Sequence, residues 1–130
     1  MKMIVTDPKA IALQFNDCVN SRDIKCLEHL MTDDHVFIDK TNNVKNGKQT
    51  CLKSWKGFFE MFPDYKNIFR TITAKDNLVI IVGHSTCSDV RLDGRAIWTA
   101  KIQHDQVAEW RVYEYSTGNK QGLGISEDQV

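Results

Sequence analysis

Long apolar segments are missing from this chain of 130 residues. The longest run made only of apolar residues is Leu78 to Val82, far short of the ~20 residues that a membrane-spanning helix needs. The first residues, Met1 to Asp7, also lack the apolar core of a secretory signal before an acidic residue intervenes. We therefore expect no membrane insertion and a cytoplasmic protein.

An excess of charge of either sign is also missing, because 17 Lys and Arg residues balance 17 Asp and Glu residues. The basic residues are scattered along the chain and form no cluster. Nucleic acids and anionic membranes are bound through basic faces, so this balance argues against both as partners. A net charge of zero leaves little self-repulsion and makes self-association easier.

The four cysteines, Cys18, Cys26, Cys51 and Cys87, show neither a Cys-x-x-Cys pair nor clustering with histidine. A structural zinc site therefore has no supporting spacing, and a disulfide framework is unusual in a domain large enough to have its own core. We expect free thiols in a reducing compartment. Nucleophile motifs, glycine-rich phosphate loops and dinucleotide fingerprints are absent as well. Any chemistry is thus predicted to be acid–base chemistry without a cofactor or metal.

Apolar residues at helical spacing predict three helices in the first half of the chain. Asp7 is a suitable N-cap for the first helix, and Pro8 fits its first position. Asp23 or Ser21 caps the second helix. The third helix follows a polar, Asn-rich loop, carries an aromatic stripe typical of a core, and ends at Pro63.

After residue 64 the period of the pattern changes to that of strands. Strands are predicted over residues 35–39, 65–74, 78–88, 96–104 and 107–115. Short connections between the last four imply an antiparallel meander, which twists strongly and wraps against the third helix. Residues 1–116 are therefore predicted to form one α+β domain. We expect a cone-shaped α+β barrel, with three N-terminal helices packed on a strongly bent, mainly antiparallel sheet around an apolar pocket. Residues 117–130, with three glycines and few apolar side chains, are predicted to be a mobile tail.

Several diffuse patterns, in this order and at this spacing, resemble one known group of proteins. They are the helix-pair segment 15–23, the segment 30–39, Asn46-Gly47, Phe62-Pro63-Asp64 and the closing segment 107–110. Over residues 7 to 115 the chain is similar to the nuclear-transport-factor-like superfamily, in the style of the SnoaL-like polyketide cyclases and ketosteroid isomerases. The resemblance implies the cone-shaped fold, but that fold hosts isomerases, cyclases, dehydratases and binding modules.

Asp39, at the end of the first predicted strand, is the first candidate for catalysis. The resemblance to ketosteroid isomerases implies that its carboxylate projects into the pocket as a general base. Desolvation among apolar walls would raise its pKa toward a useful range. The alternative is that Asp39 accepts backbone hydrogen bonds from the loop that follows, a common role for Asp at a strand end.

The side chains that assist such a base in the related enzymes have no equivalents in this sequence. Phe15 stands where the isomerases have a tyrosine donor on the first helix, and Trp98 stands at the position of their second acid. In the SnoaL-like cyclases a histidine also falls at or beside Trp98, and an aspartate falls near Val112. We therefore do not expect steroid isomerisation of the usual kind, and the cyclase assignment is weakened.

His84 is the second candidate, because strict alternation after Leu78, Ile80 and Val82 would turn it inward. There it would form a proton-transfer pair with Asp39. The alternative is a histidine that bonds a neighbouring hydroxyl or is turned outward by a bulge. The resemblance implies that the Trp110 face of the last strand points into the pocket, although the residues alone do not decide which face does. The pocket lining expected on this basis is Phe15, Phe37, Trp55, Phe59, Trp98, Trp110, Val112 and Glu114.

The other face of the last strand carries Glu109, Arg111, Tyr113 and Tyr115, a composition typical of protein–protein interfaces. We expect a homodimer through this outer sheet face, and the alternative is a solvated face. Two functions remain open. The first is a cofactor-independent isomerase, cyclase or lyase that acts on a small apolar carbonyl compound with Asp39 as base. The second is a non-catalytic ligand-binding or dimerisation module of the same fold.

Overall fold

The computed structural model describes residues 7–126. Four helices, one 3₁₀ helix and a six-stranded sheet make up this part of the chain. In chain order they are α1 (Pro8–Asn20), α2 (Ile24–Leu30), β1 (Met31–Ile38), β2 (Val44–Asn46), α3 (Lys48–Met61), β3 (Lys66–Lys75), β4 (Leu78–Thr86), η1 (Val90–Leu92), β5 (Gly94–Gln103), β6 (Gln106–Glu114) and α4 (Thr117–Gly122).

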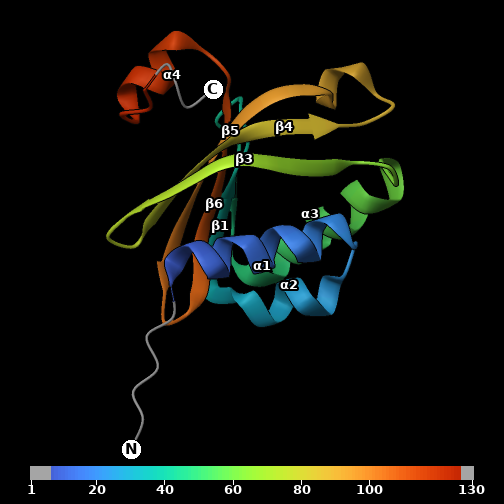
Figure 1. The fold of residues 1–130 in the computed structure, drawn as a ribbon. Helices are drawn as coiled ribbons and strands as arrows, with labels where there is room; N and C mark the ends of the chain where they lie inside the picture. The colour runs from blue at the N-terminus through green and yellow to red at the C-terminus, as the bar shows by residue number, and fades with distance from the viewer. Residues whose placement is uncertain (1–6, 127–130) are drawn as a thin grey trace, which may run out of the picture.

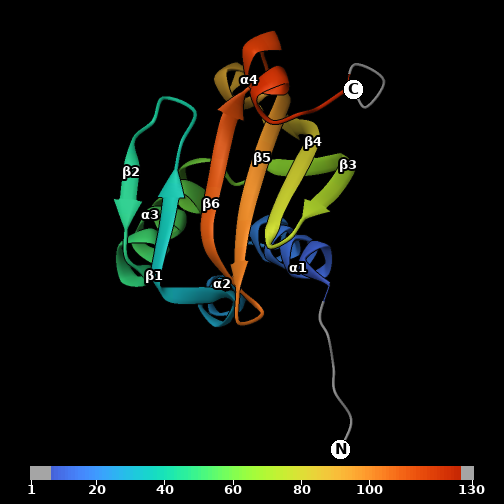
Figure 2. The same ribbon diagram turned by 90° about the vertical axis from the view of Figure 1, so that its left-hand side faces the viewer.

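The sheet has the order β2-β1-β6-β5-β4-β3 and is mixed, because β1 and β6 run parallel while the other neighbours are antiparallel. It bends strongly, and α1, α2 and α3 cover its concave side (Figure 1). Figure 2 shows β1, β6 and β5 running side by side, with β2 at the edge. The predicted α+β fold, a layer of helices on a bent, mainly antiparallel sheet, is confirmed. The sheet stays open, with β2 and β3 as its edges.

The helix boundaries follow from their caps. The Asp7 side chain accepts a hydrogen bond from the Lys9 amide at 2.9 Å, and Asp23 accepts one from the Cys26 amide at 3.1 Å. Each bond satisfies one of the amides that a first helical turn leaves without a partner. Pro8 occupies the start of α1, as predicted.

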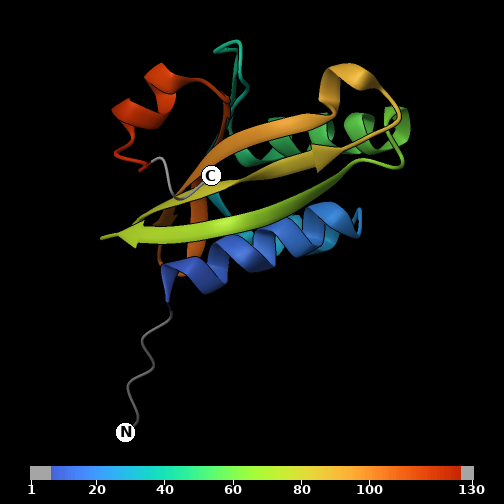
Figure 3. The ribbon, with the colours of Figure 1, turned by 45° about the horizontal axis from the view of Figure 1, so that its top comes forward.

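Helix α1 runs beside β3 (Figure 3) and is attached to it by asparagine side chains. Asn20 bonds the Asn67 backbone twice, since its Nδ2 donates to the Asn67 carbonyl and its Oδ1 accepts from the Asn67 amide, both at 2.9 Å. Arg22 Nη2 donates to the Tyr65 carbonyl at 2.6 Å. These bonds replace the sheet neighbour that β3 lacks at the edge, and they hold the start of β3 in place.

One secondary-structure prediction was wrong, and an unpredicted helix forms near the C-terminus. The segment 40–47, expected as a loop, contains β2, whose residues Val44 and Asn46 pair with Ile38 and Val36. In the expected mobile tail, α4 forms because Ser116 caps it and because Lys120 is buried with its Nζ 4.9 Å from the centre of the Tyr115 ring. Local capping and this cation–π contact outweigh the polar composition. Residues 127–130 of that tail lie outside the described part.

The expectation of four free thiols was also wrong. Cys18 on α1 and Cys26 on α2 form a disulfide, with Cα atoms 5.5 Å apart, while Cys51 and Cys87 are free. The spacing of the cysteines in the sequence did not predict this bond. The tight turn between α1 and α2 brings the two residues together only once both helices have formed. The bond joins the helices that cover one end of the core.

Reduction of this disulfide is expected to lower the free energy of unfolding by about 2.5 kcal/mol, because a short closed loop restricts the unfolded chain. The measurement is thermal melting with and without dithiothreitol. Cys26→Ser should melt at the temperature of the reduced wild type and should not respond to the reductant. If the melting temperature of the wild type also does not change with reductant, the Cys18 and Cys26 thiols are free and the disulfide is contradicted.

Candidate functional site

A cavity of about 670 Å³ opens between α3 and the concave side of the sheet. Its apolar wall is aromatic and comes from four elements. The wall residues are Phe37, Trp55, Phe58, Trp98, Trp110 and Val112. A cavity of this volume is in the range of small-molecule sites.

Six of the eight predicted lining residues line this cavity, namely Phe37, Trp55, Trp98, Trp110, Val112 and Glu114. Phe15 and Phe59 do not. Phe15 is fully buried, with its ring 4.5 Å from Trp110 and 5.8 Å from His35, so it belongs to the packing behind the wall. Phe59 packs against Trp55 at 5.5 Å between ring centres.

The three tryptophans of the wall carry indole N–H groups that are buried without a hydrogen-bond partner among the described residues. Their rings are held by other aromatic rings, for example Trp55 by Phe37 at 5.5 Å and Trp98 by Phe69 at 5.3 Å. A buried donor without a partner costs free energy, and the packing of the surrounding aromatic rings offsets this cost.

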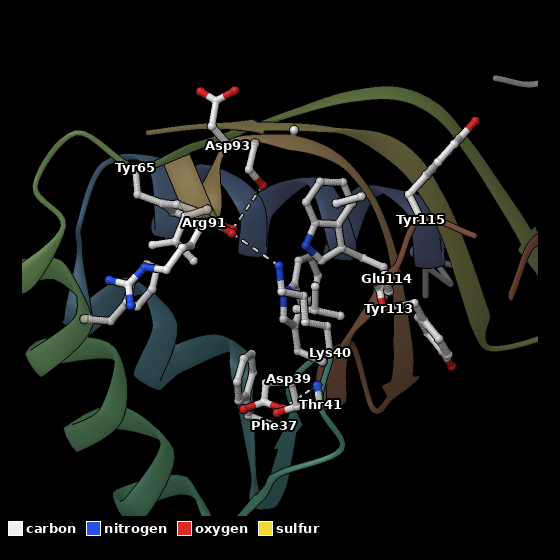
Figure 4. Close-up of a pocket in the computed structure, with 18 of the residues that line it drawn as sticks. Phe37, Asp39, Lys40, Thr41, Tyr65, Arg91, Asp93, Tyr113, Glu114 and Tyr115 are labelled. Atoms are coloured by element: carbon white, nitrogen blue, oxygen red, sulfur yellow. Dashed lines mark hydrogen bonds between the residues drawn. The ribbon is translucent and has the colours of Figure 1, made fainter. Parts of the chain in front are cut away.

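Asp39 lies at the edge of the cavity, immediately after β1. Its Oδ1 accepts three hydrogen bonds, from the Thr41 amide at 2.9 Å, the Thr41 hydroxyl at 2.8 Å and the Asn43 amide at 3.0 Å. Figure 4 shows Asp39 and Thr41 joined in this way. Partial desolvation raises the pKa of Asp39, but the bonds from Thr41 and Asn43 together outweigh it and hold the pKa below its ordinary value. The expected rise in pKa was wrong.

Asp39→Asn is expected to lower the free energy of unfolding by about 1 kcal/mol at neutral pH, because an amide is a weaker acceptor than a carboxylate for these donors. Since the folded-state pKa is lowered, this stability is present above the unfolded pKa of about 3.9 and is lost as the pH falls below it. Urea unfolding at pH 7 and pH 3 measures both effects. A variant as stable as the wild type at pH 7 would contradict the anchoring role.

His84 does not share the cavity with Asp39. On β4 the inward side chains are Val79, Ile81 and Ser85, so His84 points to the other face of the sheet. The predicted alternation started from the wrong face. Both faces of this strand are apolar along most of its length, and therefore the pattern itself carries no signal for which face is covered.

Tyr65 and Ser85 form the polar part of the cavity wall that the sequence did not predict. The Tyr65 hydroxyl lies 3.2 Å from the Ser85 hydroxyl, which donates to Asn67 Oδ1 at 2.8 Å. Figure 4 shows the Tyr65 side chain in the wall of the cavity. All three residues are buried, and burial raises the pKa of the Tyr65 phenol despite the bond to Ser85, so the phenol is protonated at neutral pH. The sequence signal for them is Ser85, a polar residue on the same face of β4 as the apolar Val79 and Ile81.

Loops at the mouth of the cavity carry charges of both signs. Lys40 Nζ donates to the Arg91 carbonyl at 3.3 Å and so connects the β1–β2 loop to η1. Arg91 is paired with Asp89 through two bonds, Nε to Oδ1 at 3.0 Å and Nη2 to Oδ2 at 2.6 Å, which lower the pKa of Asp89 to about 2. The positive charge of Arg91 is therefore compensated within the chain.

Within residues 7–126, no group of three His, Cys, Asp or Glu side chains is arranged to hold a metal ion. In the same residues, no helix has both the length and the apolar content needed to cross a membrane.

The model of the SnoaL-like domain family matches residues 12–115 of this sequence. The chain belongs to the SnoaL-like domain family. No curated protein sequence matches it. The match runs from α1 to the end of β6 and includes every residue of the aromatic wall, so the cavity lies within the SnoaL-like domain.

Known structures share the fold of this SnoaL-like chain at low sequence identity. A proposed SnoaL-like polyketide cyclase from Shewanella putrefaciens is 16% identical, with a TM-score of 0.73 over 93% of this chain and 99% of the other. IdmH, a proposed polyketide cyclase from Streptomyces antibioticus, is 14% identical, with a TM-score of 0.71 over 92% and 100%. An LEH-like epoxide hydrolase from M. tuberculosis is 12% identical, with a TM-score of 0.71 over 82% and 80%.

Proposed function

We propose that this SnoaL-like protein binds a small, largely apolar compound that carries a carbonyl oxygen, and that the cavity is its binding site. The observation that carries the proposal is the aromatic wall of the cavity, with cationic side chains at its mouth. Flat apolar rings fit aromatic walls, and the N–H groups of Lys40 and Arg95, which also line the cavity, are donors for a carbonyl oxygen.

The finer proposal is that the protein is a cofactor-independent isomerase, cyclase or lyase with Asp39 as general base. Asp39 borders the cavity, and a bound apolar ligand would exclude water from its carboxylate and so raise its basicity. Proton abstraction next to the carbonyl would place negative charge on the carbonyl oxygen, where the cationic side chains at the mouth of the cavity stabilise it. His84 takes no part in this proposal, because it lines a different cavity.

The test is deuterium exchange in D₂O with a small enolisable ring ketone, for which 1-tetralone serves as probe. The wild type is expected to speed exchange next to the carbonyl above the buffer rate, and Asp39→Asn should reduce the enzyme-dependent rate by about a hundredfold or more. Thr41→Val is the matched control, because it removes one bond to the carboxylate and keeps the carboxylate itself. Quenching of tryptophan fluorescence reports binding in all three proteins.

A non-catalytic ligand-binding module is the second candidate, and the hydrogen bonds of Asp39 favour it. They lower the pKa of the carboxylate and commit its Oδ1 to the loop, which makes it a weaker base. Binding of the ketone with no exchange above the buffer rate would support this module and overturn the enzyme. Absence of binding to any ring ketone would overturn both.

A homodimer through the outer sheet face and a location in the cytoplasm also remain proposals. Light scattering of the purified protein tests the first, and fractionation of expressing cells tests the second. The disulfide makes the second test informative, because such bonds persist mainly in oxidising compartments.

A further inference from the structure

A second cavity, of about 240 Å³, lies on the other face of the sheet and is bordered by basic side chains. Arg70 comes from β3, His84 from β4 and Arg95 from β5, while Tyr115 follows β6. Three successive strands therefore each bring one nitrogen-rich side chain to the same place. No carboxylate is among its lining residues.

The sheet register explains why these side chains meet. His84 pairs with Arg95 across β4 and β5. Arg70 is the unpaired residue of the register shift in β3 between Phe69 and Thr71, which turns it toward the same face. Arg95 Nη1 donates to the Tyr115 hydroxyl at 3.1 Å, and its guanidinium lies 5.2 Å from the centre of the Tyr115 ring.

The positive charges of Arg70 and Arg95 are not compensated by an ion pair among the described residues, in contrast to those of Lys48, Arg91 and Lys101. Arg70 on β3 and Arg95 on β5 lie on the same face of the sheet with only β4 between them, and their like charges repel each other. Two guanidinium groups beside a cavity offer the forked donors that carboxylate and phosphate oxygens accept. An anion in this cavity would offset the repulsion and use those donors.

The two cavities share part of their walls, because Gly94, Arg95 and Tyr115 line both. Arg95 thus stands between the apolar cavity and the basic one. We propose that Arg70, His84 and Arg95 form an anion-binding site that takes a carboxylate or phosphate group. The anion is either the acidic group of the ligand whose apolar part fills the main cavity or a free anion. Only the first of these sources rests on the proposed function.

The first experiment titrates the protein with inorganic phosphate at low ionic strength and follows the amide and arginine side-chain signals by NMR. Signals of Arg70, His84 and Arg95 should shift together. Arg70→Gln and Arg95→Gln should each weaken phosphate binding about tenfold. Lys101→Gln is the matched control, because it removes one positive charge from the same strand as Arg95 without touching the cavity, and it should bind as the wild type does.

The second experiment compares 2-naphthylacetate with its methyl ester, which keeps the naphthyl ring but carries a methyl group in place of the negative charge. If the ligand supplies the anion, the acid binds the wild type more tightly than the ester, and Arg95→Gln removes the difference. Equal binding of acid and ester, together with phosphate binding, identifies a free anion as the occupant.

Phosphate binding without binding of either naphthyl compound would uphold the anion site while the proposed function fails. The site itself is overturned if phosphate produces no shifts at these residues, or if Lys101→Gln weakens binding as much as the two arginine variants. Both arginines are exposed, so these variants should stay folded, and their melting curves check this.

Discussion

Gly83→Ala is expected to lower the free energy of unfolding by about 3 kcal/mol or more, and to lower the melting temperature by about 10 °C or more. A Cβ atom at this position would lie 2.0 Å from the Ile68 carbonyl oxygen and 3.0 Å from the Phe69 Cα. Both are backbone atoms of β3, so the clash cannot be relieved by rotating a side chain. The register shift of β3 next to Phe69 requires this close approach.

Gly57→Ala is the matched control for that prediction. A Cβ atom there meets nothing within 4 Å, and Gly57 lies in the interior of α3. Alanine is the better helix former, so this variant should gain about 0.5–1 kcal/mol. Chemical denaturation of both variants measures the two effects. A Gly83→Ala protein as stable as the wild type would mean that β3 and β4 are further apart than described.

Phe15→Ala is expected to cost about 3–5 kcal/mol of stability, the usual range for removing a buried phenyl ring. The ring is fully buried between the Trp110 and His35 rings, and it supports the cavity wall from behind. His35 depends on the same packing: its Nδ1 lies 2.6 Å from the Val107 carbonyl oxygen, and burial lowers its pKa, which favours the neutral ring.

Leu13→Ala on the same helix is the control, because Leu13 is 43% exposed and its truncation should change stability by less than about 1 kcal/mol. Guanidinium unfolding compares the two variants. Equal effects of the two substitutions would contradict the assignment of Phe15 to the core.

Much of the fold could be predicted from the sequence because its signals are local. Asp7 with Pro8, and Asp23, define helix starts through bonds within one turn, and the structure contains those bonds. The short turns after β3 and β5 are also local signals, and they predict that the strands they connect are antiparallel neighbours. The α4 helix was missed although its Ser116 cap and the contact between Lys120 and Tyr115 are also local, because the glycines and the polar composition of this segment argued against a helix.

The candidate site was less predictable, because its geometry depends on partners far apart in the chain. Tyr65 reaches Ser85 and Asn67 only when β3 and β4 are paired and α1 holds their edge. For Asp39, the residue could be selected from the sequence, but the direction of its pKa shift depends on whether donors from the loop reach the carboxylate.

The sequence by itself determined the α+β class and the family, whereas the face of β6 that lines the cavity was expected only from the family resemblance. Only the tertiary structure decided which face of β4 points into the core. Both faces of this strand are largely apolar, so neither is preferred until α1 and α3 cover the sheet. That choice turned Ser85 into the main cavity and His84 toward Arg70 and Arg95. It also decided the Cys18–Cys26 bond, because two helices must pack before their thiols can meet.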